Sequence, residues 1–365
     1  MRDFLPNFPL SPLPKTGTRI LLLRHGRSTL NDQQRYQGSS DDSTLTDQGH
    51  LASQQMGQFL ENCPLDAVYV SPLQRAQETL VDLLPYLKTQ PQQIQTSELL
   101  QEIKFPTWEG RSYQEVRTQD SDRYQCWQMR PDQFQIQTEE NCVFYPVLEL
   151  YERIQQFWQT ILPLHSGETL LIVGHGSSNQ ALINTAFGIS PRYHHYFQQT
   201  HSGLTVFDIL TPGCSQMQLL NFTLDSGLPK LKVGKQGLRL VLLPFHPHCP
   251  PQPMLLAKFN SVSIQEMIGE NCDLLQQLAQ AHLEAKITIL QESHLSLRAL
   301  SPLNHKELNT VCAIALPSKL SRLLSQLFPF PHSVELFPNT FSVVHYPSSQ
   351  NFPILQGMNL NVLKG

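Results

Sequence analysis

Short runs of apolar residues alternate with amphipathic segments along the first half of the chain. The apolar runs predict strands that are buried on both faces; they lie at residues 19–23, 67–70 and 169–173. The amphipathic segments predict helices, which lie at residues 46–60, 73–84, 149–162 and 177–187. Strands and helices in this order predict βαβ units. We therefore expect an α/β fold with three layers, α/β/α, around a mostly parallel sheet.

A proline-rich start and a later glycine-containing stretch divide the chain into three segments. The first segment, residues 1–17, is expected to be extended and lacks the continuous apolar core of a signal peptide, because prolines interrupt it at Pro6, Pro9, Pro12 and Pro14. Glycine and proline near residues 226–236 predict a domain boundary. For a chain of 365 residues we expect one domain at 18–228 and a smaller one at 236–365.

Composition and charge argue against several classes of protein. A net charge of −4 with 26 Lys and Arg residues lacks the basic excess of nucleic-acid-binding proteins. No apolar run approaches the ~18 residues that a membrane span requires, so no membrane partner is expected. The seven cysteines are scattered and form no CxxC pair, which is typical of a reducing compartment. These features together predict a cytoplasmic protein.

Two histidines follow predicted strands directly and are flanked by glycine. They are His25, after the strand at 19–23, and His175, after the strand at 169–173. Ligands of parallel α/β sheets bind at the carboxyl ends of the strands, and a helix N-terminus beginning near Gly176 favours an anion. Either histidine alone would more often be a structural residue at a strand end. Together they predict an anion-binding site.

Five motifs extend this pattern over residues 19 to about 225. They are Arg24–Asn31 (RHGRSTLN), Leu45–Gly49 (LTDQG), Ser71–Thr79 (SPLQRAQET), Leu100–Ile103 (LQEI) with Trp108–Gly110 (WEG), and Val173–Gly176 (VGHG). In order and spacing they resemble the motifs of the histidine phosphatase superfamily, in its phosphoglycerate-mutase-like branch. This resemblance implies the histidine phosphatase fold and a small phosphorylated metabolite as the substrate.

The residue types suit phosphoryl transfer on chemical grounds. Arginine offers planar, charged donors for phosphate oxygens, a neutral imidazole can attack phosphorus, and a carboxylic acid can protonate the leaving group. The resemblance assigns the roles: His25 is the nucleophile and Glu102 the proton donor, whereas Arg24, Arg75 and His175 form the phosphate pocket with Asn31 and Gly176 as further positions. This mechanism requires no metal and no cofactor.

Each assignment has an alternative. Glu109, in the WEG motif, competes with Glu102 for the role of the acid, and Arg75 could be a solvated helix arginine. The segment from His246 to Cys249 could ligate a metal, although its spacing matches no standard zinc site. We expect His194 and its neighbour His195 to lie on the surface.

A phosphatase is favoured over a mutase. The mutases of the family carry a paired-arginine segment in the insert, whereas this chain has spaced arginines among acidic residues, at Arg111, Arg117, Arg123 and Arg130. Shorter motifs resemble the 2-carboxyarabinitol-1-phosphate phosphatase group; they are Trp108–Gly110, Tyr145–Leu150, Asn179–Leu182 and Gln199–Asp208. We expect a metal-independent phosphomonoesterase that hydrolyses a sugar acid phosphate or a sugar phosphate through a phosphohistidine. Phosphoglycerate-mutase-type transfer and a low-turnover phosphate-binding or regulatory protein remain alternatives.

The C-terminal part reads as a degenerate second copy of the first. Residues 19–26 align with 239–246 at an offset of 220, and residues 168–187 align with 309–328 at an offset of 141. Residues 204–207 and Asn221 then match residues 341–344 and Asn359. The alternative is a chance match between leucine-rich α/β segments.

The proposed copy lacks the catalytic residues. Pro244, Phe245 and Leu316 stand where Arg24, His25 and His175 would be. The two offsets differ by 79 residues, and we expect the missing stretch to have held the counterparts of Arg75 and Glu102. An inactive domain of this kind could extend the sheet, cover the first domain or form the face of a homodimer.

Overall fold

The structure is a computed structural model. It describes residues 10–13, 15–88, 91, 93–137, 142–211, 213–225, 227–231, 234, 236–270, 272–290, 307–350 and 352–361. Most of the proline-rich segment predicted at 1–17 lies outside this range. Contacts divide the described chain into two compact units. The first comprises residues from 10 to 195 and from 199 to 216, and the second comprises 196–198 and the residues from 217 onward.

The first unit contains the predicted, mostly parallel sheet. Its strand order is β7-β1-β6-β2-β3, and the strands are β1 (Thr18–Arg24), β2 (Ala67–Val70), β3 (Gln93–Thr96), β6 (Thr169–Gly174) and β7 (Leu204–Thr211). All pairings are parallel except that of β7 with β1. The central strands β2 and β6 are buried at every position, as their continuous apolar sequence predicts.

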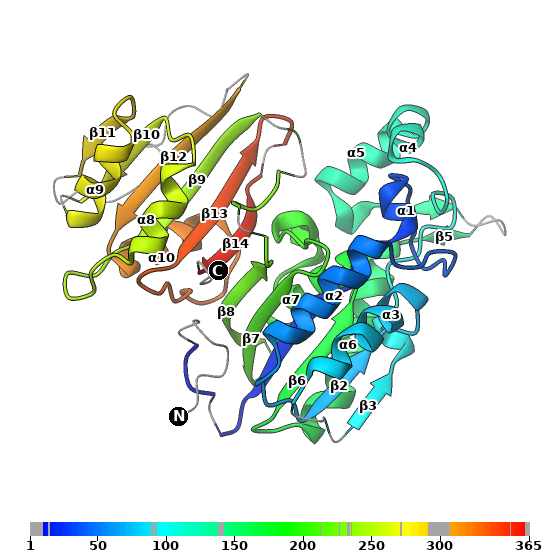
Figure 1. The fold of residues 1–365 in the computed structure, drawn as a ribbon. Coiled ribbons are helices and arrows are strands. Elements are labelled where there is room, and N and C mark those ends of the chain that lie inside the picture. The colour runs from blue at the N-terminus through cyan, green and yellow to red at the C-terminus, as the bar shows by residue number, and fades with distance from the viewer. Residues whose placement is uncertain are drawn as a thin grey trace. The chain divides into compact units, whose positions relative to one another are not determined.

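Four helices cover this sheet. They are α2 (Asp47–Phe59), α3 (Gln74–Leu83), α6 (Pro146–Ile161) and α7 (Gly176–Ala186). Helix α2 packs against α3, whereas α6 packs against α7. Right-handed crossover connections that run in opposite directions along a sheet place their helices on opposite faces. The pair α2 and α3 and the pair α6 and α7 therefore form the two outer layers. Figure 1 shows α2 over one face of the sheet. The α/β/α prediction is confirmed.

An insert between β3 and α6 has an aromatic core. Its elements are α4 (Tyr113–Gln119), α5 (Ser121–Met129), β4 (Ile136–Gln137) and β5 (Val143–Phe144). The Trp108 ring is fully buried and lies 4.9 Å from the Phe134 ring, while the Trp127 ring lies 5.5 Å from Phe134. The short helix α1 (Thr29–Asp32) follows β1. The insert is therefore a packed subdomain rather than a loose loop.

The second unit contains a mixed sheet, with three parallel and three antiparallel pairings. Its order is β11-β10-β12-β9-β13-β14-β8, with β8 (Cys214–Phe222), β9 (Gly237–Pro244), β10 (Glu266–Gly269), β11 (Lys286–Ile289), β12 (Leu308–Ala315), β13 (Phe341–Pro347) and β14 (Ile354–Leu360). The helices are α8 (Pro253–Asn260), α9 (Asp273–Ala281) and α10 (Pro317–Leu327). Strands β9 to β12 are mutually parallel, and β13 pairs antiparallel with β9 (Figure 1).

The two sheets share strand order and pairing register. In the first unit Arg19 pairs with Thr169 on β6 and with Asp208 on β7. In the second unit Arg239 pairs with Thr310 on β12 and with His345 on β13. Arg239 and Thr310 lie at the sequence offsets of 220 and 141, and His345 lies at the offset of 137 that relates residues 204–207 to residues 341–344. The register therefore agrees with the alignment of the two segments.

The second unit keeps one element that the sequence alignment treats as lost. Helix α3 begins at Gln74 and α9 at Asp273, each seven residues after the start of the preceding strand. Counted from the start of the strand, Leu274 therefore stands at the position that Arg75 has in the first unit. The shortened interval lies mainly between β11 and β12. The corresponding interval of the first unit, between β3 and β6, holds Glu102 and the insert.

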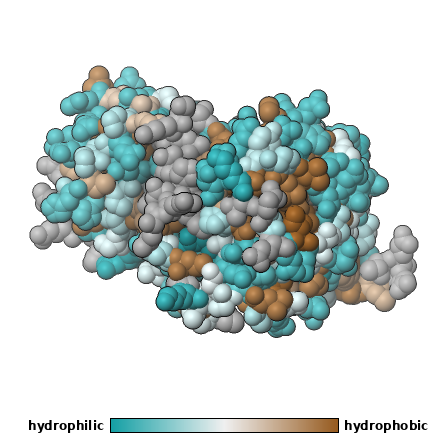
Figure 2. All heavy atoms as spheres, turned by 60° about the horizontal axis from the view of Figure 1, so that its bottom comes forward, coloured by the Kyte–Doolittle hydropathy of each residue, from teal (hydrophilic) through white to brown (hydrophobic). Residues whose placement is uncertain are grey.

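No helix in the described part of the chain is long and apolar enough to cross a lipid bilayer. On the face drawn in Figure 2, hydrophilic side chains surround the hydrophobic patches.

Candidate active site

The two strand-end histidines lie side by side. Arg24 at the end of β1 pairs with Gly174 at the end of β6, so the next residue of each strand reaches the same level. His25 N donates to Gly174 O at 2.9 Å, and the ring centroids of His25 and His175 are 5.1 Å apart. The two residues are 2% and 0% exposed. The register of the parallel strands thus brings together two residues that are 150 positions apart in the sequence.

His25 is held as a neutral imidazole with a free lone pair on Nε2. Its Nδ1 lies 2.6 Å from Gly26 O, and a carbonyl oxygen only accepts, so Nδ1 carries the proton. Burial lowers the pKa of His25 well below the usual 6.5, and the positive charges of Arg24 and Arg75 lower it further. The ring is therefore arranged as a nucleophile.

His175 also carries its proton on Nδ1, but for a different reason. Its Nε2 lies 2.7 Å from Ser71 Oγ, while its buried Nδ1 has no hydrogen-bond partner among the described residues. A neutral ring that accepts from the Ser71 hydroxyl carries its proton on Nδ1. Burial and the charge of Arg75 lower the pKa of His175 well below 6.5. His175 can therefore donate to a bound oxygen without becoming charged.

Arg24 and Arg75 form no ion pair with any described carboxylate. Arg24 Nη1 donates to Gln199 O at 2.9 Å, and Arg75 donates to Ser40 O and Gly38 O at 2.8 and 2.9 Å. The Nε atoms of both arginines are buried and have no hydrogen-bond partner in the described part of the chain. Arg75 is fully buried, and burial lowers its pKa to about 10. Buried charges are usually paired, so these two mark an anion site.

Glu102 lies at the N-terminus of α7. Its Oε1 accepts from Ser178 N at 3.0 Å and from Ile103 N at 2.9 Å, and its Oε2 accepts from Ser177 N at 3.0 Å. These three donors fix the carboxyl group, and the helix N-terminus is a place where negative charge is favoured.

Gly176 separates Glu102 from Arg24. A Cβ atom at this position would lie 3.6 Å from both Glu102 Oε2 and Arg24 Nε. The side chains of the proposed acid and of one phosphate ligand therefore approach the same stretch of backbone. The structure thus brings together His25, His175, Arg24, Arg75, Glu102 and Gly176.

Glu109 has a different place from Glu102. Its Oε1 accepts from Ser39 N at 2.8 Å, from Ser39 Oγ at 3.1 Å and from Phe105 N at 3.1 Å. Ser39 lies between the two residues whose carbonyls bind Arg75. Glu109 therefore fixes the loop that holds Arg75, which favours Glu102 as the acid.

Asn31 is engaged in a local cap. Its Oδ1 accepts from Ser28 N at 3.3 Å and from Ser28 Oγ at 2.8 Å, at the start of α1. These contacts give Asn31 a role in shaping the turn after His25, and its predicted place in the phosphate pocket stays a prediction.

A third imidazole, His201, also lies beside the nucleophile. Its ring centroid is 5.9 Å from that of His25. Ser202 has a left-handed backbone (φ 52°), and its N–H donates to His25 O at 3.3 Å. The motif Gln199–Asp208 contains His201, but nothing in its spacing marks this residue as part of the site.

The expectation that His194 and His195 lie on the surface is wrong for His194. It is fully buried, and its Nδ1 lies 3.2 Å from the Tyr151 hydroxyl, which accepts from Asn184 Nδ2. His195 Nε2 lies 2.8 Å from Trp127 O. The pair therefore packs beneath the insert.

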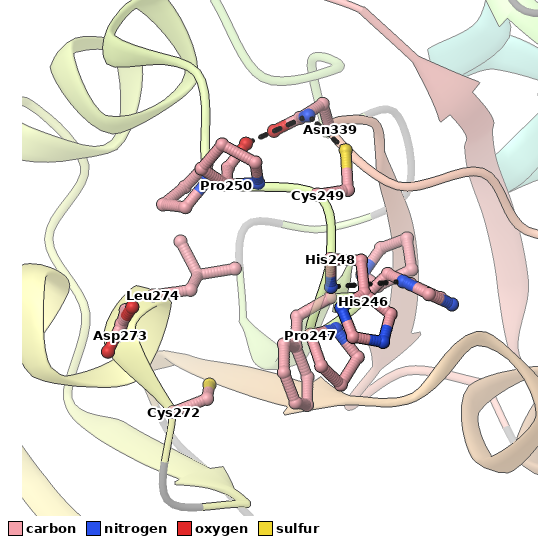
Figure 3. A pocket seen from close by; sticks show the side chains of 12 residues that line it. His246, Pro247, His248, Cys249, Pro250, Cys272, Asp273, Leu274 and Asn339 are labelled. Carbon is pink, nitrogen blue, oxygen red and sulfur yellow. Dashed lines mark hydrogen bonds between the residues drawn. The ribbon is translucent and has the colours of Figure 1, made fainter.

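His246, His248 and Cys249 line a pocket of the second unit (Figure 3). Within the described ranges, no three His, Cys, Asp or Glu residues are placed to hold a metal ion.

Comparisons with known proteins agree with this geometry. The family model of the histidine phosphatase superfamily (branch 1) matches residues 20–223. A 2-carboxy-D-arabinitol-1-phosphatase of Triticum aestivum is 34% identical over 200 residues, which are 55% of this chain and 38% of that protein. The "Probable 2-carboxy-D-arabinitol-1-phosphatase" of Arabidopsis thaliana is 32% identical over 196 residues, 54% of this chain and 39% of that protein. The chain thus spans less than two fifths of the length of these relatives.

Among solved structures, the alpha-ribazole phosphatase from Shigella flexneri is 23% identical, with a TM-score of 0.48 over 56% of this chain and 96% of that one. Since the family model covers more than half of its residues, this chain belongs to the histidine phosphatase superfamily, branch 1.

Proposed function

We propose that this chain is a metal-independent phosphomonoesterase that acts through a phosphohistidine on His25. The observation that carries the proposal is a set of three buried nitrogens without partners among the described residues: Arg24 Nε, Arg75 Nε and His175 Nδ1. Unpartnered buried donors are costly, and a phosphate dianion offers acceptors for all three. They accompany a neutral histidine with a free Nε2.

In the first step the Nε2 lone pair of His25 attacks phosphorus. A P–N bond forms while the P–O bond to the leaving group breaks. Three N–H donors favour the carboxylate form of Glu102, so Glu102 has to take up a proton before this step. It gives that proton to the departing oxygen, so the product leaves as an alcohol and a carboxylate remains. Arg24, Arg75 and His175 donate hydrogen bonds to the other phosphate oxygens and stabilise the charge that develops there.

In the second step water resolves the intermediate. The Glu102 carboxylate takes a proton from water as the water oxygen attacks phosphorus. The P–N bond breaks, and its electron pair returns to Nε2 of His25. Inorganic phosphate leaves, and Glu102 has regained its proton for the next cycle.

The substrate class that we propose is a phosphorylated sugar acid. The similarity to the wheat and Arabidopsis proteins supports this class. His201 beside the nucleophile also supports it, because a third imidazole near the phosphate could bind a carboxylate of the leaving group.

We also propose that the second unit, taken over residues 236–365, is a degenerate copy of the first, taken over residues 18–228. The shared strand order and register support this duplication. Pro244, Phe245, Leu274 and Leu316 replace the counterparts of Arg24, His25, Arg75 and His175. A unit with these replacements would have no phosphatase activity of its own.

The test is turnover of p-nitrophenyl phosphate in a chelator by the wild type, by His25→Ala and by His50→Ala. His50 is a partly exposed histidine that pairs with Asp82, and it serves as the matched control. We expect the wild type and His50→Ala to be active and His25→Ala to lose at least a thousandfold in rate. After a rapid quench, alkali-stable and acid-labile phosphate should be found on His25. Activity that the chelator abolishes, or an active His25→Ala variant, would contradict the proposal.

Absence of both turnover and label would favour the low-turnover binding alternative. A mutase would instead return the phosphate to the product. Phosphoglycerate isomers would interconvert faster than inorganic phosphate is released, which a chromatographic assay distinguishes.

A further inference from the structure

The second unit has a pocket at the carboxyl ends of its parallel strands (Figure 3). Its volume is about 460 Å³, which suits a small organic molecule. The loop after β9 forms one wall, and the first turn of α9 forms another. In open α/β sheets this end of the sheet is where ligands bind.

The pocket occupies the place that the phosphate site has in the first unit. Pro244, Phe245 and Leu274 all line it. By register they stand where Arg24, His25 and Arg75 stand. The backbone is kept as well, since Phe245 N donates to Ala315 O at 3.1 Å, as His25 N donates to Gly174 O at 2.9 Å. Figure 3 shows the Leu274 side chain pointing into the hollow.

The charge of the pocket is reversed relative to the first unit. Among the described residues that line it there is no Lys or Arg, and Asp273 is the one of them with a formal charge at neutral pH. The first unit offers two arginines in the equivalent place. A phosphate ester would therefore find no cation in this pocket and would face a carboxylate.

The walls are rich in rings. Four prolines and Phe245 line the pocket, and the rings of His246 and His248 lie 5.6 Å apart at its mouth. Such surfaces suit a flat apolar ligand, and the two imidazoles can hydrogen-bond to its edge.

The loop after β9 is held in place without a ligand. Asn339 Nδ2 donates to Cys249 Sγ at 3.1 Å and to Pro250 O at 3.2 Å, and its Oδ1 accepts from Gln252 N at 2.9 Å. One side chain therefore fixes the loop at three points. A wall that is already ordered reduces the entropy cost of binding.

We propose that this pocket binds a small, ring-containing molecule that is neutral or positively charged, and that it excludes phosphate esters. The degenerate copy would thus have exchanged the phosphate site for one of opposite charge preference. The proposal concerns a site distinct from the proposed catalytic one and does not depend on turnover.

The test uses three probes that share one ring: tryptamine (cationic), indole (neutral) and indole-3-acetate (anionic). Binding to the full chain is measured by saturation-transfer NMR and titration, with inorganic phosphate as competitor. We expect tryptamine to bind at least tenfold more tightly than indole-3-acetate, indole to lie between them, and phosphate not to compete. Leu274→Arg should weaken the binding of tryptamine at least tenfold. Leu283→Arg, at a side chain that is 88% exposed, should leave the binding of tryptamine unchanged.

Asp273→Asn gives a milder second test, since it should weaken the binding of tryptamine and leave the binding of indole unchanged. Thermal melting verifies that each variant is folded, and p-nitrophenyl phosphate turnover of Leu274→Arg reports separately on the proposed phosphatase. The proposal is overturned if no probe binds, if indole-3-acetate binds as tightly as tryptamine, or if folded Leu274→Arg binds tryptamine like the wild type.

Discussion

Asn221 and Asn359 adopt the same left-handed backbone conformation and make equivalent hydrogen bonds. Each has a φ of 54°. Asn221 Nδ2 donates to Gln356 O at 2.6 Å, and Asn359 Nδ2 donates to Gln218 O at 3.0 Å. Each acceptor lies three residues before the other asparagine, so the paired strands β8 and β14 are related symmetrically. A reciprocal contact of this kind is expected between corresponding strands of a duplicated fold.

The first prediction concerns the stability that Asn359 provides. Asn359→Ala should lower the free energy of unfolding by about 2–4 kcal/mol, because alanine is strained by about 1–2 kcal/mol at positive φ and buried hydrogen bonds are lost as well. Asn359→Gly should cost less, since glycine avoids the strain. Urea denaturation measures both. Equal losses for the two variants would show that the backbone conformation contributes nothing.

The second prediction concerns the pH dependence of the nucleophile. Only neutral His25 can attack phosphorus, and its pKa lies well below 6.5 because of burial and the two arginines. The acid-side fall in kcat/KM should therefore come well below pH 6.5. Imidazole NMR with ¹⁵N-labelled histidine checks this without relying on turnover. Arg24→Gln removes one positive charge and should move the midpoint of His25 upward; an unchanged midpoint would rule out the proposed influence of Arg24.

The third prediction assigns a positioning role to Glu109. Glu109→Ala leaves Ser39 N and Phe105 N without their acceptor, which costs about 1–3 kcal/mol for a buried donor and loosens the loop that holds Arg75. We expect KM for p-nitrophenyl phosphate to rise about tenfold.

Glu109→Gln keeps an oxygen acceptor and is the matched control, which should restore most of the affinity. If Glu109 acted only through its charge, both variants would bind p-nitrophenyl phosphate equally weakly. An effect on melting temperature with no change in KM would instead indicate a structural role alone.

The fourth prediction concerns acid stability and His194. Burial lowers the pKa of His194 well below 6.5, so between that value and 6.5 the unfolded chain binds a proton that the folded chain does not. The free energy of unfolding should therefore be unaffected by this group above pH 6.5. It should fall below pH 6.5 by up to about 1.4 kcal/mol per pH unit. His194→Gln should flatten this dependence in urea titrations at several pH values, and an unchanged slope would contradict the assignment.

The parts of the fold that the sequence predicts depend on local signals. A buried strand followed by a histidine and glycine can be recognised within ten residues, and both strand-end histidines meet because parallel strands align their carboxyl ends. The role of Glu109 cannot be recognised in this way, since its hydrogen bond to Ser39 spans 70 positions. His194 lies in a polar stretch, and its burial involves Trp127 of the insert and Tyr151 of α6, which are distant in the sequence. The proposed correspondence of Leu274 with Arg75 could not be found from residue identity, because it rests on the equal intervals from strand to helix.

Under the proposed function, the buried charges of Arg24 and Arg75 would link the stability of the protein to its substrate. Glu102 lies near both guanidinium groups, but neither forms an ion pair with a described carboxylate, and a bound phosphate would supply a direct partner. A ligand that binds only the native state adds about 2.7 kcal/mol of stability at a hundredfold excess over its Kd. A cell that accumulates the phosphorylated metabolite would therefore also protect this protein from unfolding and proteolysis. When the metabolite is exhausted, the protein would become easier to degrade. The supply of the metabolite would then set the amount of the protein as well as the rate of the reaction.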